Sequence, residues 1–145
     1  MAFSEYAQPR QLHPDFCSQH EIGPFQRSFV MLKPHNFRLI PEIGAVIEES
    51  GLEITGGTTL NFSKKQAEAL YKEHLGKEYY SSLIALTYGE VFLFEVVGNN
   101  AISVIRNEVI KKVRCKYGIN SLQDIVHAPD GPVAYQRESS VLSLK

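Results

Sequence analysis

Four segments with the pattern of β-strands lie along the chain, separated by segments with helical periodicity. The first is almost continuously apolar and ends in a lysine followed by Pro34, which is typical of a central strand whose last residue leaves the sheet. The second is rich in Thr and Ile, and its Gly56-Gly57 pair predicts a bulge. The predicted strands are Arg27–Lys33, Leu52–Phe62, Val91–Val97 and a short β-branched run at Ile125-Val126.

The intervening segments carry helix start and stop signals. Pro41 suits a first helical turn, Gly51 suits the residue after a helix, and Ser63 is a good N-cap. Two short adjacent helices predict a hairpin that projects from the main body. The predicted helices are Pro41–Ser50, Lys64–Gly76, Lys77–Tyr88, Asn100–Gly118 with Asn100 as its cap, and a last turn at Val133–Glu138 before a tail.

The order of these elements predicts an α/β protein of the α+β type. With the hairpin set aside, the order is βαββαβ, the ferredoxin-like pattern of a four-stranded antiparallel sheet with helices on one face. Residues 1–25 are polar and contain three prolines, so they are interpreted as an N-terminal arm. Residues 26–145 are expected to form one domain with an inserted helical hairpin and a short C-terminal tail.

Composition and net charge argue against a nucleic-acid-binding, membrane-spanning, secreted or zinc-binding protein. The net charge of −1 predicts no general attraction to nucleic acid or to an anionic membrane. No apolar run is long enough to span a bilayer, and the N-terminus lacks a signal-peptide pattern. Cys17 and Cys115 form no CxxC motif, which favours free thiols in a reducing cytoplasm, although a disulfide between them stays open. No Cys/His spacing indicates zinc.

Three basic side chains and one histidine have positions that suit a site. His127 follows a strand and precedes a turn of Pro129, Asp130 and Gly131, which presents its ring to a cleft; by itself, such a histidine is more often inert. Lys33 at a strand end is either a solvated charge or a fixed phosphate ligand. Arg106 and Arg114 fall on similar sides of one helix if that helix is unbroken.

These residues occur together in an order that resembles the nucleoside diphosphate kinase family, over about Arg27 to Glu138. The resemblance includes the strand ending in Lys-Pro and the spacing between the second arginine and the histidine. The residues that carry it are Phe29–Pro34, Tyr71, Lys77-Glu78-Tyr79-Tyr80, Asn100 with Arg106, Arg114, and His127 with Asp130 and Glu138.

The resemblance implies transfer of the γ-phosphate of a nucleoside triphosphate to a nucleoside diphosphate. The reaction would be a ping-pong exchange through a phosphorylated His127, whose neutral imidazole is a competent nucleophile. Glu138 would accept a hydrogen bond from the other ring nitrogen. Lys33 would reach the ribose hydroxyl and the transferred phosphate.

The resemblance also implies a nucleotide site. Arg106, Arg114 and Lys77 would hold the phosphates, with Mg²⁺ bridging the phosphates rather than occupying a protein metal site. Tyr71 would bind at or near the γ-phosphate, and Tyr79 and Leu83 would flank the base. The predicted partners are nucleoside di- and triphosphates and further copies of the chain, in a dimer at least; no membrane or specific nucleic acid is expected.

Five departures from the family pattern keep an alternative open. The segment between Arg106 and Arg114 is several residues shorter, and Asp124 stands in place of an asparagine that bonds the ribose. The other replacements are Lys77 for arginine, Ala128-Pro129 for Gly-Ser, and His35-Asn36 for Asp-Gly. The alternative is a catalytically weak or inactive nucleotide-binding or interaction module on the same fold.

Overall fold

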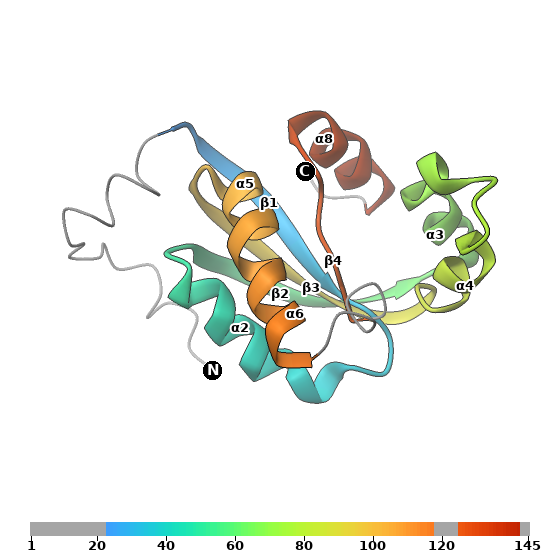
Figure 1. Ribbon diagram of the computed structural model, residues 1–145, viewed down its shortest axis with the longest axis horizontal. Coiled ribbons are helices and arrows are strands. Elements are labelled where there is room, and N and C mark those ends of the chain that lie inside the picture. The colour runs from blue at the N-terminus through green and yellow to red at the C-terminus, as the bar shows by residue number, and fades with distance from the viewer. Residues whose placement is uncertain (1–22, 118–124, 143–145) are drawn as a thin grey trace.

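A four-stranded antiparallel sheet forms the centre of the protein in the computed structural model, which describes residues 23–117 and 125–142 (Figure 1). The strand order is β2-β3-β1-β4. It confirms the predicted ferredoxin-like topology, because β1 lies in the middle and pairs with both β3 and β4. The strands are β1 (Phe25–Leu32), β2 (Glu53–Phe62), β3 (Gly89–Asn99) and β4 (Val126–His127).

The helices are arranged around this sheet in two groups. In Figure 1, α2 and the α5–α6 segment run across the sheet together, whereas α3, α4 and α8 gather toward one end. The segments are η2 (Phe37–Leu39), α2 (Ile40–Glu49), α3 (Lys64–Leu70), η3 (Lys72–His74), α4 (Tyr80–Ala85), α5 (Ala101–Val104), a π-helical turn η4 (Ile105–Val109), α6 (Ile110–Tyr117) and α8 (Pro132–Val141).

Helices cover both faces of the sheet, which corrects the expectation of helices on one face. Successive side chains of β1 point to opposite faces. Val30 and Leu32 therefore join α2, α5 and α6 in one apolar cluster, while Phe29 and Met31 join a second cluster with α3, α4 and α8. The second cluster draws its apolar side chains from the hairpin, so the hairpin is packed onto the sheet rather than projecting from it.

Local sequence signals placed several helix ends correctly. Ser63 caps α3 in a full capping box, in which its hydroxyl accepts from Gln66 N and the Gln66 side chain accepts from Ser63 N. Gly51 follows α2 at a φ of 86°, a conformation that glycine adopts without strain. The predicted β2 bulge occurs between Ile54 and Gly56.

Other helix ends differ from the prediction. Helix α4 is shorter than the predicted helix at 77–88, and α8 extends through residues expected to be tail, because Leu142 packs into the second cluster and holds the last turn. Asn100 precedes α5 in a left-handed conformation and its side chain makes no capping hydrogen bond. No helix among the described residues has the length and apolarity needed to cross a membrane.

Candidate active site

The histidine predicted to carry the chemistry is held against a buried carboxylate. Strand β4 pairs with β1 so that His127 lies opposite Met31, and its Nε2 lies 2.7 Å from Oε1 of Glu138 on α8. The two side chains are 13% and 6% exposed, respectively. Because a carboxylate accepts hydrogen bonds, this contact places the ring proton on Nε2 and leaves the lone pair of Nδ1 for another partner.

Tyr71 lies beside the His127 ring, and Lys33 lies beside Tyr71. Lys33 follows β1, is fully buried, and donates its backbone N–H to the Ile125 carbonyl at 2.7 Å. Its Nζ lies 5.0 Å from the centre of the Tyr71 ring, a distance that permits a cation–π contact. The Tyr71 ring is itself 5.0 Å from the His127 ring, edge to face. The lysine is therefore a fixed charge rather than a solvated one.

The Tyr71 hydroxyl is held in its protonated form. Burial raises the pKa of Tyr71 well above its ordinary value of 10.0; a hydrogen bond with Thr87 opposes this shift, and the charge of Glu138 adds to it. Tyr71 stands at the C-cap of α3, 5% exposed. A neutral phenol beside His127 is a hydrogen-bond donor at any physiological pH.

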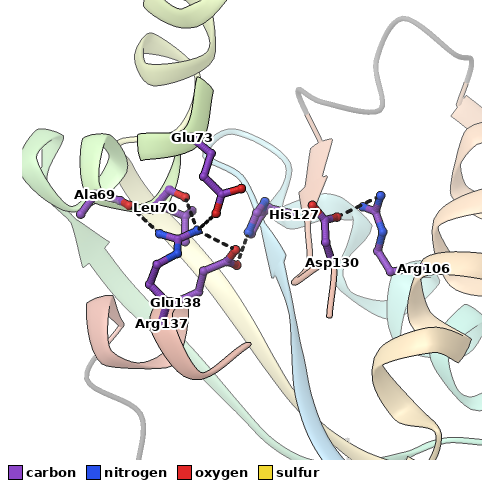
Figure 2. A network of polar contacts seen from close by, with 8 residues as sticks. All are labelled: Ala69, Leu70, Glu73, Arg106, His127, Asp130, Arg137 and Glu138. Carbon is purple, nitrogen blue, oxygen red and sulfur yellow. Dashed lines mark hydrogen bonds and ion pairs between the residues drawn. The ribbon is translucent and has the colours of Figure 1, made fainter. Parts of the chain in front are cut away.

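Arg106 and Glu138 lie on different sides of His127 in Figure 2. It lies in the π-helical turn η4, and its Nη2 is 3.0 Å from Oδ1 of Asp130, just beyond His127 in the chain (Figure 2). π-Helical turns occur often at functional sites. Arg114 lies on α6 and is exposed. The expectation that the two arginines share a side assumed an unbroken α-helix, and η4 interrupts that helix.

The hairpin supplies the remaining described candidates. Tyr79 is 40% exposed and its hydroxyl is 2.7 Å from Nδ1 of His74. Lys77 is exposed between η3 and α4. Leu83 is 5% exposed and belongs to the second apolar cluster, so it packs as a core residue. Asp124 lies outside the described residues.

Two residues at the site were not predicted from the sequence. His74 contacts the rings of both Tyr71 and Tyr79 and thereby connects two of the predicted binding residues. Arg137 contacts the second oxygen of Glu138. The only signal for Arg137 was its place beside Glu138, and neighbouring residues on a helix do not ordinarily face each other.

The described residues contain no group of three or more His, Cys, Asp or Glu side chains arranged to hold a metal ion. Mg²⁺ that enters with a nucleotide keeps several waters and binds mainly through phosphates, with one or two carboxylates. The exposed carboxylate of Asp130 fits such a role, and a cage made by protein side chains alone does not fit these residues.

The family resemblance assigns Arg106 to the phosphates of a nucleotide. On that assignment, we expect Asp130→Asn to bind Mg-free nucleoside diphosphate about two- to fivefold more tightly, because an exposed ion pair worth ~0.5–1 kcal/mol no longer competes for Arg106. Titration calorimetry in EDTA measures the change. Glu42→Gln is the matched control, since it removes a carboxylate from an exposed ion pair with Lys116 on another part of the molecule. Weaker binding by Asp130→Asn would contradict the competition.

Comparisons with known proteins agree with this geometry. A family model described as nucleoside diphosphate kinase matches residues 26–143. Nucleoside diphosphate kinases of Sulfurisphaera tokodaii and Ignicoccus hospitalis are each 34% identical over 128 residues, which cover 80% of this chain and 87% of theirs. That of Listeria welshimeri is 30% identical over 78% of this chain and 85% of its own.

Solved structures extend the likeness to three dimensions. A halophilic nucleoside diphosphate kinase from Halobacterium salinarum, in complex with CDP, has a TM-score of 0.70 at 26% identity, covering 81% of this chain and 87% of that one. The Aquifex aeolicus enzyme has a TM-score of 0.68 at 19% identity, covering 82% and 95%, and supports the fold alone. The chain belongs to the nucleoside diphosphate kinase family.

Proposed function

We propose that this nucleoside diphosphate kinase transfers phosphate through Nδ1 of His127. The observation that carries the proposal is the 2.7 Å contact between Nε2 of His127 and Oε1 of Glu138. A carboxylate accepts hydrogen bonds, so in this proposal Nε2 carries the ring proton and Nδ1 carries the nucleophilic lone pair. The ring is held by a buried carboxylate and flanked by Tyr71, so little reorientation is needed before attack.

In the first half-reaction, Nδ1 attacks the γ-phosphorus of a nucleoside triphosphate. The new P–N bond forms as the bond to the β-phosphate oxygen breaks, and the nucleoside diphosphate leaves with that electron pair. The ring gains positive charge, which the adjacent Glu138 carboxylate stabilises. In the second half-reaction, a terminal oxygen of another nucleoside diphosphate attacks the phosphorus, the P–N bond breaks, and His127 returns to its neutral form.

Cationic residues bind the phosphates in this proposal. Lys33 provides a buried charge beside Tyr71, directed at the transferred phosphate and the ribose hydroxyl. Arg106 exchanges Asp130 for a phosphate, and Arg114 and Lys77 add charge from α6 and the hairpin. Mg²⁺ arrives bound to the nucleotide and neutralises phosphate charge.

The base and ribose contacts are proposed on the hairpin and near the histidine. Tyr79 is exposed enough to stack on a base, and the contact with His74 restricts its hydroxyl end. Leu83 is assigned beside the base by the resemblance alone, because its side chain is buried in the second apolar cluster. Asp124 is assigned to the ribose hydroxyl by the resemblance alone.

The test is to incubate the protein with γ-labelled ATP and Mg²⁺, then to chase with an unlabelled nucleoside diphosphate. The expected product of the first step is an acid-labile, base-stable phosphoprotein, and the chase is expected to remove the label as nucleoside triphosphate. Nucleotide binding without any labelling would refute the proposal and support the inactive binding module instead.

We also propose that the chain acts as a cytoplasmic homo-oligomer, a dimer at least. Strand β2 is at an edge of the sheet and pairs with β3 alone among the described strands, and such an edge is available to a second copy. Cys115 is exposed, and a reducing compartment would keep such a thiol free. Light scattering at micromolar protein concentration measures the molar mass of the assembly, and the mass of a monomer would contradict the proposed oligomer. Cell fractionation tests the proposed compartment.

A further inference from the structure

Arg137 joins three separate parts of the site through one guanidinium group (Figure 2). Its Nη2 lies 3.0 Å from Oε1 of Glu73 in η3 and 3.4 Å from Oε2 of Glu138. Its Nη1 donates to the Ala69 carbonyl at 3.0 Å, and Nη2 is 3.5 Å from the Leu70 carbonyl. The group therefore connects α8 with the end of α3 and the turn that follows it.

The contact with Glu138 matters because that carboxylate is buried. Its Oε1 is engaged by His127 and its Oε2 faces Arg137. At 3.4 Å the second contact is long for a hydrogen bond, so Arg137 acts mainly as a nearby charge that limits rotation of the carboxylate. A buried carboxylate with one charge partner removed is poorly stabilised and reorients toward other donors.

The contacts with α3 fix the guanidinium itself. The last carbonyls of a helix lack partners within the helix, and Arg137 binds the carbonyls of Ala69 and Leu70 at the end of α3. Tyr71 is the next residue, and its ring meets the His127 ring at 5.0 Å. One side chain thus contacts both the carboxylate that binds His127 and the backbone just before the tyrosine that packs against His127.

An ordinary surface ion pair does not explain this arrangement. The pair between Arg137 and Glu73 is partly exposed, with side-chain exposures of 33% and 68%, and such pairs contribute little to stability. The same guanidinium faces a carboxylate that is only 6% exposed. The charge of Arg137 therefore matters more for the buried carboxylate of Glu138 than for the exposed carboxylate of Glu73.

We propose that Arg137 is a positioning residue for phosphoryl transfer. It holds the Glu138 carboxylate in the orientation in which Oε1 binds Nε2 of His127, and Glu73 with the two α3 carbonyls holds Arg137. This inference rests on the proposed function, because orienting the ring nitrogen matters only if His127 is the nucleophile.

The experiment compares Arg137→Gln with Arg137→Lys and Glu73→Gln. The readouts are the single-turnover rate of histidine phosphorylation at saturating ATP, the dissociation constant for nucleotide, and the ¹⁵N NMR tautomer of the His127 ring. Arg38→Gln is the matched control, because Arg38 is exposed and also donates to a backbone carbonyl, that of His35.

We expect Arg137→Gln to lower the saturated rate about tenfold or more, as loss of an outer orienting partner does at other histidine sites. Nucleotide affinity is expected to change little, and the ring is expected to lose its uniform Nε2–H tautomer. Arg137→Lys keeps the positive charge but lacks the planar guanidinium group with its several donors. Its rate is therefore expected to lie between those of Arg137→Gln and the wild type. Glu73→Gln is expected to change the rate in the same direction by about two- to threefold, and Arg38→Gln to change nothing.

The inference would be overturned if Arg137→Gln kept the wild-type saturated rate and His127 tautomer and showed only a lower melting temperature. Arg137 would then contribute to the stability of the fold alone. If Arg137→Gln does not fold, the same two readouts in Arg137→Lys and Glu73→Gln decide the matter. If the wild type forms no phosphohistidine, the proposed function fails, and the tautomer change still tests whether Arg137 orients Glu138 and His127.

Discussion

His127→Ala is expected to reduce nucleotide phosphate exchange by about 10⁴-fold or more, because it removes the atom that forms the covalent intermediate. Among the described residues, the side-chain partners of the Glu138 carboxylate are His127 and Arg137, and of these two His127 alone has a ring nitrogen that can act as a nucleophile. The variant is expected to take no label from γ-labelled ATP and to keep nucleotide affinity near the wild-type value, since the phosphate-binding cations remain in place.

The matched control is His35→Asn. His35 lies two residues after Lys33 and has a φ of 72°, a left-handed conformation that asparagine tolerates well. This variant removes a histidine close to the site without removing the proposed nucleophile. Equal labelling of His127→Ala and the wild type would place the phosphate on another residue, and loss of labelling in His35→Asn would mean that the assay reports more than the nucleophile.

Glu138→Gln is expected to slow phosphorylation of His127 by about 10- to 100-fold. The glutamine carbonyl still accepts a hydrogen bond from Nε2, but it carries no charge to stabilise the ring as positive charge develops there. The amide also removes the negative charge that faces Arg137, so the attraction between these two side chains is lost. Rapid-quench measurement at saturating ATP isolates the chemical step from binding.

Glu68→Gln is the control for that variant, because Glu68 is an exposed carboxylate on α3, a helix in contact with α8. Its phosphorylation rate is expected to match the wild type. Melting temperatures of both variants show whether folding is affected. A Glu138→Gln protein that is folded and as fast as the wild type would remove Glu138 from the mechanism.

The amino-acid sequence was enough to predict the order of the strands and helices and to propose His127 and Glu138 as functional residues. Alternation along β1 sends Val30 and Phe29 into different apolar clusters, and a strand pattern of that kind depends only on near neighbours. Capping at Ser63 and the glycine after α2 are likewise local, since their partners lie within a few residues. The resemblance then placed His127 and Glu138 together, and the structure joins them.

The surroundings of His127 and Glu138 depend on contacts between segments that are far apart in the chain. Arg137 meets Glu73 and the end of α3 across 64 to 68 residues of chain, a separation at which no local pattern carries information. The π-helical turn at Arg106, the second helical layer and the added length of α8 arise in the same way. Packing against distant segments overrides local preference, so the proposed nucleophile could be identified from the sequence, whereas the group proposed to orient its partner could not.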